Sequence, residues 1–256
     1  MYGERMYAKN VIGFFILSVL LISGVVQAQD ATEIIKKMDE KMRGESLKAS
    51  VTMKIVRPNW SREVSMQSWS KGTEYSMILI TAPARDEGTA FLKRGNEIWN
   101  WLPSVGRTIK MPPSMMMQSW MGSDFTNDDL VRESSIITDY QHKMAGEETI
   151  DGYECYKIEM TPNPNAPVVW SRVDVWVSKK EFIELKAEFY DEYGDLISVM
   201  NGKDVKEFGG RMIPSVMEMI PMDKEGHKTI LEYKAMQFNE KIEDDFFSIQ
   251  NMRRLQ

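Results

Sequence analysis

The feature that most constrains the fold is a period of two in the hydrophobic pattern along most of the chain. In one early run, apolar Val51, Met53 and Ile55 alternate with Thr52 and Lys54, as expected for a strand that buries one face. Similar runs follow, separated by turn residues rich in Gly, Asn and Asp. The clearest lie at 64–69, 75–79, 90–93, 97–102, 105–110, 135–147, 153–161, 171–178, 183–191, 196–208, 211–222 and 227–238.

The pattern predicts about ten or eleven antiparallel strands and few helices. So many strands rarely remain one flat sheet, because curling reduces the exposed edges. We therefore expect a mainly β protein with a single strongly curved, barrel-like antiparallel sheet. No linker, change of composition or internal repeat divides the chain, so residues 29–256 are expected to form one domain.

A few segments break the alternation and are expected to be helical. The first follows residue 29: Asp30 or Thr32 can cap it and Gly44 can close it. Its expected apolar face is Ile34, Ile35, Met38 and Met42. The methionine-rich segment 111–125 and residues 126–132, which Thr126 can cap, are expected to form short helices over a face or mouth of the sheet. Residues 244–248 are expected to form a final turn.

The first residues have the pattern of a targeting segment. Arg5 and Lys9 precede an apolar run at 11–26, and Val26-Gln27-Ala28 fits a signal-peptidase site. We expect residues 1–28 to be a cleavable signal peptide. The alternative is a retained anchor, although the run is shorter than the roughly 20 residues of a spanning helix. No cysteine lies near the site, so we expect an exported, periplasmic protein that is not lipidated.

Residues with catalytic or metal-binding chemistry are few. His142 and His227 lie in strand patterns without a Cys or His partner nearby, and Ser123 lies outside the Gly-x-Ser-x-Gly pattern of a nucleophile elbow. Cys155 is the only cysteine, and its place within a strand favours a buried structural thiol. We therefore expect neither an enzyme nor a metal or other cofactor. The formal net charge of −6 argues against a nucleic-acid partner.

The methionine-rich segment permits two interpretations. It carries Met115, Met116, Met117, Trp120, Met121 and Phe125. Methionine is flexible and polarizable, so such residues suit a lid over a greasy ligand of variable shape. They also suit a short segment that covers an ordinary hydrophobic core. Composition alone favours this second interpretation, because exposed apolar patches are uncommon. Trp99 and Trp101 share one strand face, and with Phe91 they either fill a core or form a cavity wall.

The chain also resembles a known family. Residues 88–103 (GTAFLKRGNEIWNWLP) look like the family's hairpin ending in aromatic-Leu-Pro, and residues 119–130 (SWMGSDFTNDDL) look like its most distinctive motif. The similarity continues at 106–109, 140–146, 153–160, 170–176, 189–194, 229–233 and 246–247. The family is the LolA/LolB-like group of outer-membrane lipoprotein-sorting carriers and similar exported proteins.

The resemblance implies a half-open β-barrel whose helices cover a hydrophobic cavity for the acyl chains of a lipoprotein or lipid. It implies a monomeric carrier with transient membrane contact, which ferries cargo from an inner-membrane exporter to an outer-membrane acceptor. We assign the cavity and lid to Phe91, Trp99, Trp101, Met115, Met116, Met117, Trp120, Met121 and Phe125. Gly122, Ser123 and Asp124 would form the hinge of the lid, and Arg57 would be the arginine that holds the lid shut.

Two other functions remain open. Proteins of this branch are associated with RND-type lipid exporters, so the chain could be an adaptor or accessory protein that binds an exporter through the methionine-rich segment. It could also be a hydrolase of envelope lipids, which would require Ser123 or Asp124 close to a histidine.

Overall fold

The computed structural model describes residues 30–132 and 135–255. The expected signal peptide, residues 1–28, lies outside this part of the chain. No helix within the described ranges is both long and apolar enough to span a lipid bilayer.

The described chain opens with helix α1, Ala31–Arg43. The Asp30 side chain accepts a hydrogen bond of 3.1 Å from the amide of Thr32, so Asp30 is the N-cap of the two candidates. Gly44 ends the helix at a positive φ of 63°, a conformation that glycine adopts without strain. The predicted apolar face is confirmed, since Ile34, Ile35 and Met38 are buried.

Thirteen strands form one antiparallel sheet, a few more than predicted. Each alternating run of the sequence contributes a strand, and the boundaries differ by a few residues. The strands are Ser46–Arg57 (β1), Trp60–Lys71 (β2), Tyr75–Ala82 (β3), Ala90–Arg94 (β4), Glu97–Leu102 (β5), Arg107–Lys110 (β6), Tyr140–Ile150 (β7), Tyr153–Pro162 (β8), Arg172–Ser178 (β9), Glu184–Tyr190 (β10), Leu196–Phe208 (β11), Arg211–Pro221 (β12) and Lys228–Phe238 (β13).

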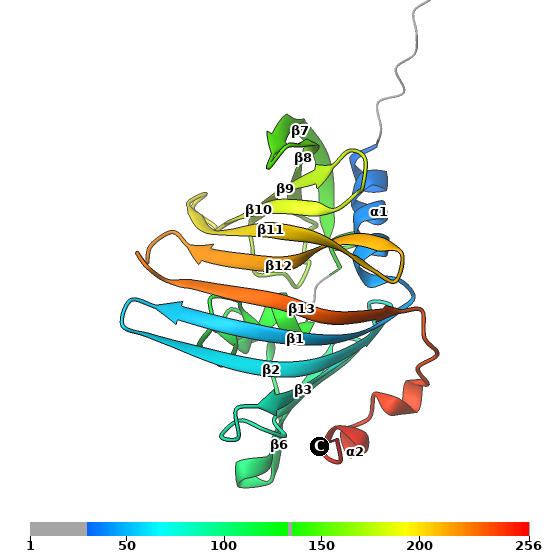
Figure 1. The fold of residues 1–256 in the computed structure, drawn as a ribbon, viewed down its shortest axis with the longest axis vertical. Coiled ribbons are helices and arrows are strands. Elements are labelled where there is room, and N and C mark those ends of the chain that lie inside the picture. The colour runs from blue at the N-terminus through cyan, green and yellow to red at the C-terminus, as the bar shows by residue number, and fades with distance from the viewer. Residues whose placement is uncertain (1–29, 133–134, 256) are drawn as a thin grey trace, which may run out of the picture.

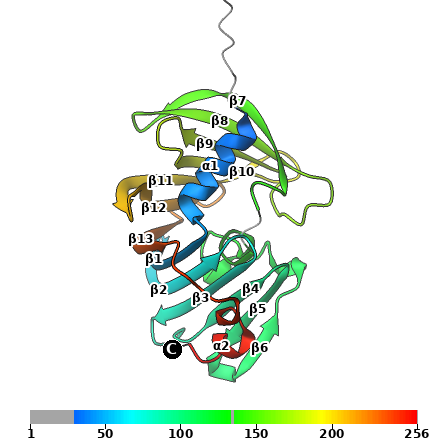
Figure 2. The ribbon, with the colours of Figure 1, turned by 90° about the vertical axis from the view of Figure 1, so that its right-hand side faces the viewer.

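The sheet order is β6-β5-β4-β3-β2-β1-β13-β12-β11-β10-β9-β8-β7. Strands adjacent in sequence pair with each other, with the exception of β6 and β7. In addition, β1 pairs with β13, from Leu47 opposite Phe238 to Val56 opposite Lys228. The edge strands β6 and β7 do not pair with each other in the described residues, so the curved sheet stays open (Figures 1 and 2). The prediction of a single curved antiparallel sheet is therefore confirmed.

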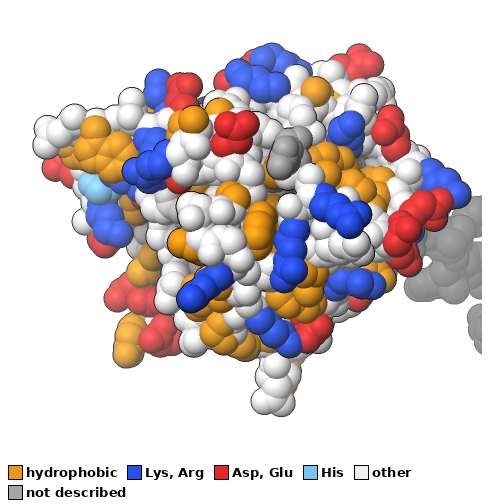
Figure 3. Space-filling model, turned by 90° about the horizontal axis from the view of Figure 1, so that it is seen from below, with side chains coloured by type: hydrophobic (Ala, Val, Ile, Leu, Met, Phe, Trp, Pro, Cys, Tyr) orange, Lys and Arg blue, Asp and Glu red, His pale blue; other side chains and the backbone are white. Residues whose placement is uncertain are grey.

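The sheet buries side chains on both faces. We call the face to which Ile78 and Ile80 point the inner face; α1 and the segment between β6 and β7 pack against it and share its core. The opposite, outer face of β3 and β4 is covered by the C-terminal segment, which includes η5 (Asp244–Phe246) and α2 (Ile249–Met252). Phe247 and Met252 of that segment are fully buried. Seen from the end near α2 and β6, the surface mixes basic, acidic and hydrophobic side chains (Figure 3).

The described parts of the segment between β6 and β7, residues 111–132 and 135–139, lie on the inner face, and we call residues 111–132 the flap. The flap contains the short helical turns η2 (Pro113–Met115), η3 (Trp120–Gly122) and η4 (Asp128–Arg132). Another such turn, η1 (Pro103–Val105), lies between β5 and β6. The short helices expected at 111–125 and 126–132 are present as single turns of 3₁₀ and π type, and none of them is an α-helix. Pro112 and Pro113 lack amide donors, and an isolated bridge between Ser119 and Thr126 folds the flap back on itself.

Candidate ligand cavity

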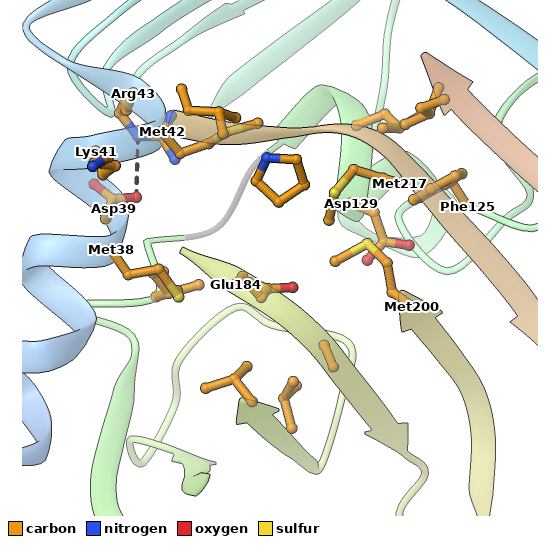
Figure 4. Close-up of a pocket in the computed structure, with 18 of the residues that line it drawn as sticks. Met38, Asp39, Lys41, Met42, Arg43, Phe125, Asp129, Glu184, Met200 and Met217 are labelled. Carbon is orange, nitrogen blue, oxygen red and sulfur yellow. Dashed lines mark hydrogen bonds and ion pairs between the residues drawn. The ribbon is translucent and has the colours of Figure 1, made fainter. Parts of the chain in front are cut away.

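A cavity of about 350 Å³ lies on the inner face of the sheet. Strands supply its walls through residues two apart, such as Val173 and Val175 of β9, because alternate strand residues share a face. Met38 of α1 lines one side and Phe125 of the flap another (Figure 4). The cavity thus lies between the first helix and the flap.

The lining is largely apolar and rich in methionine. Met38, Met42, Met160, Met200, Met217 and Met219 all contribute. Methionine has an unbranched, polarizable side chain that repacks around irregular shapes. The wall can therefore adapt to hydrocarbon chains of different length or branching.

Four carboxyl groups interrupt this apolar lining, those of Asp39, Asp128, Asp129 and Glu184. Burial raises the pKa of two of them, and the first is Asp129. Its Oδ1 accepts a hydrogen bond of 3.1 Å from Trp170 Nε1, and its Oδ2 accepts one of 2.7 Å from the amide of Thr126. The Asp129 amide in turn donates to Thr126 Oγ1 at 3.1 Å, so the pair forms a capping box and the predicted cap at Thr126 is confirmed. Burial raises the pKa of Asp129, and the hydrogen bonds from Thr126 and Trp170 act against this rise.

The second carboxyl group is Glu184, at the start of β10. It points into the cavity with Met38 on one side and Met200 on the other (Figure 4). Its Oε1 is buried and has no hydrogen-bond partner among the described residues. Burial raises the pKa of this carboxyl from 4.5 to about 7, because the charged form loses hydration and gains no hydrogen bond in exchange.

A β-bulge explains how Glu184 reaches the inner face. Glu184 lies opposite Val177, whereas Lys186 lies opposite Trp176, so Leu185 is the extra residue of β10. Residues directly opposite each other in a sheet share a face. Val177 belongs to the inner core, and Trp176 packs in a separate cluster on the outer face. The bulge therefore turns Glu184 inward and leaves Lys186 on the outer face.

Charged residues of α1 stand at one side of the cavity. Arg43 Nε lies 3.3 Å from Asp39 Oδ1, and Lys41 Nζ lies 3.6 Å from Glu181 Oε2. These ion pairs are partly exposed, so each stabilises the fold by less than about 1 kcal/mol. They mark a polar margin next to Met38 and Met42 (Figure 4).

The flap residues assigned to the lid divide into buried and exposed ones. Trp120 is fully buried and packs on Phe91 with ring centroids 5.4 Å apart, and Met116 and Phe125 are also buried. Met115 and Met121 are half-buried against the same core, whereas Met117 is 56% exposed. Of the residues assigned to cavity and lid, Phe125 lines the cavity directly. Phe91 lies beneath the flap, and Met115, Met116, Met117, Trp120 and Met121 lie within it.

Arg57 lies at the end of β1 and contacts the tip of the flap. Its Nη1 donates to Asp124 Oδ2 and its Nη2 donates to the carbonyl of Gly122, each at 2.9 Å. Thr229 at the start of β13 donates to the same Asp124 Oδ2 at 2.7 Å, and the Asp124 amide donates to Thr229 Oγ1 at 2.9 Å. The ion pair is largely buried. The residues assigned to hinge and latch are thus joined in one network.

The assignment of Trp99 and Trp101 to the cavity wall needs correction. Both pack with the outer-face cluster around Phe247 and Met252 and do not line the cavity. They share one face of β5, as the i, i+2 rule requires. The rule does not say which face, and on β3 to β5 both faces are covered, by the flap and by the C-terminal segment.

Residues considered for chemistry have structural contacts. Ser123 Oγ lies 3.3 Å from the carbonyl of Phe125, and Asp124 is bound as described above. His142 contacts the Thr32 hydroxyl at 3.2 Å and the Ile136 carbonyl at 2.6 Å. Cys155 is free and buried, and burial raises the pKa of its thiol. Within the described ranges, no group of three or more His, Cys, Asp and Glu side chains is placed to hold a metal ion.

The sequence reasoning missed the acids of the cavity, among them Glu184. In the β10 sequence ELKAEFY, polar and apolar residues alternate, which places Glu184 on the polar face with Lys186. The available signal was Gly202 inside the alternating pattern of β11. A Cβ there would lie 2.6 Å from the Glu184 carbonyl oxygen, and a glycine within a strand often marks a bulge or a close backbone approach.

Comparison with known proteins agrees with this geometry. A search of curated proteins found no match. The structure of a DUF1329 family protein from Desulfovibrio piger is 24% identical with a TM-score of 0.78, covering 87% of this chain and 97% of that one. A Vibrio parahaemolyticus domain described as an outer membrane lipoprotein-sorting protein is 22% identical with a TM-score of 0.78, covering 88% and 98%.

A LolA superfamily protein from Nitrosomonas europaea is 28% identical with a TM-score of 0.75, and the match covers 86% of this chain and 98% of that one. A protein-family model described only as "uncharacterized protein" matches residues 72–254. This match spans well over half of the chain, and the chain has the same fold as the LolA superfamily protein. The chain therefore belongs to the family of that model, and it is similar in structure to LolA superfamily and outer-membrane lipoprotein-sorting proteins.

Proposed function

We propose that this protein is a periplasmic carrier that binds the acyl chains of a lipoprotein or lipid in the cavity and ferries them toward the outer membrane. The observation that carries the proposal is the apolar cavity of about 350 Å³ between α1 and the flap, within a LolA-like fold. A sheet whose own side chains filled its interior would leave no such space.

The energetics suit a carrier. Burial of one methylene group contributes about 0.8 kcal/mol, so about ten methylene groups contribute about 8 kcal/mol, which corresponds to a Kd of about 1 μM. Such binding requires no specific polar contact and permits release to a stronger acceptor. The methionine-rich lining broadens the range of chains that fit.

We further propose that the flap is the lid of the cavity and that Arg57 holds it shut. Closed, the lid buries Met116 and Trp120 against the sheet. Opening would break the contacts of Arg57 with Gly122 and Asp124. It would extend the apolar surface that is available to a cargo by the area beneath the flap. Gly122, with a φ of 79°, is a position where the chain can pivot with little strain.

The proposed partners follow from this role. Cargo would arrive from an inner-membrane exporter and leave to an outer-membrane acceptor, with the carrier acting as a monomer. An adaptor that docks through the flap is less well supported. Met116 and Trp120 face inward, and among the methionine and aromatic residues of the flap, all of them described, Met117 alone is well exposed.

Native mass spectrometry of protein purified from cells tests the carrier function, and the mass of a bound molecule separates lipid from lipoprotein cargo. Ala187 is a buried, cavity-lining residue of β10. The larger side chain of the Ala187→Phe variant should fill the cavity and prevent binding of the co-purifying molecule. Ala235→Phe, at an exposed position of β13, is the matched control and should keep it. Protein free of any lipid, together with failure to bind added fatty acids, would refute the proposal.

A further inference from the structure

Glu184 stands out among the polar groups that line the cavity. The other titratable groups there are Asp39, Lys41, Arg43, Asp128, Asp129, Tyr140 and Tyr233. Asp39 pairs with Arg43, and Lys41 with Glu181. Asp129 receives hydrogen bonds from Thr126 and Trp170, and Asp128, Tyr140 and Tyr233 also interact with protein groups. Glu184 Oε1 is the buried lining oxygen that lacks a hydrogen bond within the described chain.

This unpaired acid is held in place by the fold. The bulge at Leu185 turns Glu184 from the outer to the inner face, and the close approach of Gly202 to its carbonyl oxygen fixes the backbone there. A regular β10 would have placed the carboxyl group on the outer face near Lys186. Glu184 is partly buried as a residue, and its Oε1 is fully buried without a partner. A buried polar atom without a partner is costly, so a local distortion that creates one indicates that a partner arrives from outside the chain.

We propose that Glu184 is a recognition site for a hydrogen-bond-donating group of the lipid cargo, a hydroxyl or an ammonium group, which binds at Oε1. The inference rests on the proposed carrier function and names the chemical class of its cargo. The apolar walls bind the hydrocarbon part of the cargo, and Glu184 accepts a hydrogen bond from its polar part. When Glu184 is ionised, a ligand that only accepts hydrogen bonds leaves Oε1 unpaired, and a carboxylate or phosphate group placed there meets a second negative charge.

This arrangement gives selectivity that the apolar walls lack. A hydrophobic pocket discriminates poorly between chains that differ by one polar group. A site built to pair with a donor, in contrast, rejects the analogue that lacks it. Phe125 and Met217 lie on the other side of the cavity from α1 (Figure 4). A cargo whose donor contacts Glu184 would therefore extend its hydrocarbon part toward them.

Displacement of an environment-sensitive naphthylamine dye from the full mature chain tests the proposal. The probes share one hydrocarbon chain: dodecanol donates a hydrogen bond, dodecylamine donates one as a cation, and methyl dodecanoate only accepts. The wild-type protein should bind at least one of the two donors about tenfold more tightly than methyl dodecanoate. Glu184→Leu should abolish this preference.

Glu184→Gln separates the two kinds of donor. The amide can still accept a hydrogen bond, so the affinity for dodecanol should survive in this variant, whereas the affinity for dodecylamine should fall with the loss of the negative charge. The NH2 group of the amide also donates to the ester, so methyl dodecanoate should bind the variant more tightly than it binds the wild type. Glu188→Gln, on the outer face of the same strand, is the matched control and should bind all three probes like the wild type. If Glu184→Leu does not fold, the comparison of Glu184→Gln with the wild type still tests whether the carboxyl group sets the preference.

The results that overturn the inference differ from those that overturn the carrier function. Equal wild-type affinity for the three probes, or a preference that survives Glu184→Leu, would refute recognition by Glu184 and leave the carrier function intact. Binding of none of the probes would refute both.

Discussion

Removal of the Glu184 carboxyl group should stabilise the empty protein, and the gain should depend on pH. The pKa of Glu184 rises from 4.5 to about 7 on folding. At low pH the carboxyl group is protonated in both the folded and unfolded states, so its ionisation does not change the free energy of unfolding. As the pH rises above the unfolded-state value, the unfolded chain loses its proton first, so the free energy of unfolding falls. The full penalty is present once the pH exceeds about 7.

The magnitude follows from the two pKa values. At about 1.4 kcal/mol for each pKa unit, the wild type loses about 3 kcal/mol between roughly pH 4 and pH 8 through this one residue. Glu184→Gln cannot ionise and escapes the loss. For a domain of this size, 1 kcal/mol changes the Tm by roughly 2–4 °C. The variant should therefore gain about 6–12 °C over the wild type at about pH 8, and little of that difference should remain at about pH 4.

The assay is thermal unfolding of lipid-free wild type and Glu184→Gln across this pH range. Any fixed cost of the buried amide is the same at every pH, so the pH dependence of the difference isolates ionisation. A difference in Tm that does not change with pH would refute the reasoning, since it would mean that the Glu184 carboxylate is hydrated or paired.

The Glu188→Gln substitution on the same strand should change the stability of the fold in the opposite direction. Burial would raise the pKa of Glu188, but hydrogen bonds from Lys186 and Tyr190 outweigh it and keep the pKa below its ordinary value. The carboxylate of Glu188 therefore stabilises the fold above its unfolded-state pKa, and that contribution is lost as the pH falls. The Glu188→Gln variant should accordingly be less stable than the wild type at neutral pH and should approach it in acid.

Three further predictions concern the flap, the outer face and the thiol. The Asp124→Asn substitution leaves the Arg57 guanidinium without its counter-charge in a largely buried site. It should destabilise the protein by about 3 kcal/mol in urea unfolding and speed the exchange of bound dye. An unchanged exchange rate would contradict the proposal that Arg57 holds the flap shut. Phe247→Ala removes a fully buried ring of the outer cluster and should cost about 3–5 kcal/mol, while dye affinity stays within a factor of about two because the cavity lies on the other face. Cys155 is buried with a raised thiol pKa, so a thiol reagent should label it slowly in the folded state and fast in denaturant; fast labelling of folded protein would contradict its burial.

The fold could be predicted from the sequence because its main signals are local. Period-two alternation marked the strands, and Asp30 and Gly44 bounded the first helix. The flap was predicted less well. Its methionine and tryptophan residues have the composition of a helix face, but two adjacent prolines and a back-folding bridge give it short turns.

The site could be predicted only in part, for two physical reasons. Alternation groups residues by face but does not say which face is inward, so Trp99 and Trp101 were assigned to the wrong side of β5. A single bulge reverses the assignment of every residue on one side of it, so Glu184 appeared to be a surface residue. The network between Arg57 and Asp124 joins residues far apart in the sequence. The family resemblance suggested Arg57 as the latch, and local patterns carried no sign of its partner.

The pairing of β1 with β13 has a consequence for how the chain assembles. The first strand lies at the centre of the sheet, and its partner on one side is the last strand. Until residues 228–238 are available, β1 and β12 each present an unpaired edge, and the two halves of the sheet have no hydrogen-bonded connection. Contacts between such distant segments form slowly. The final step of folding therefore waits for residues 228–238, which join the two halves into one sheet.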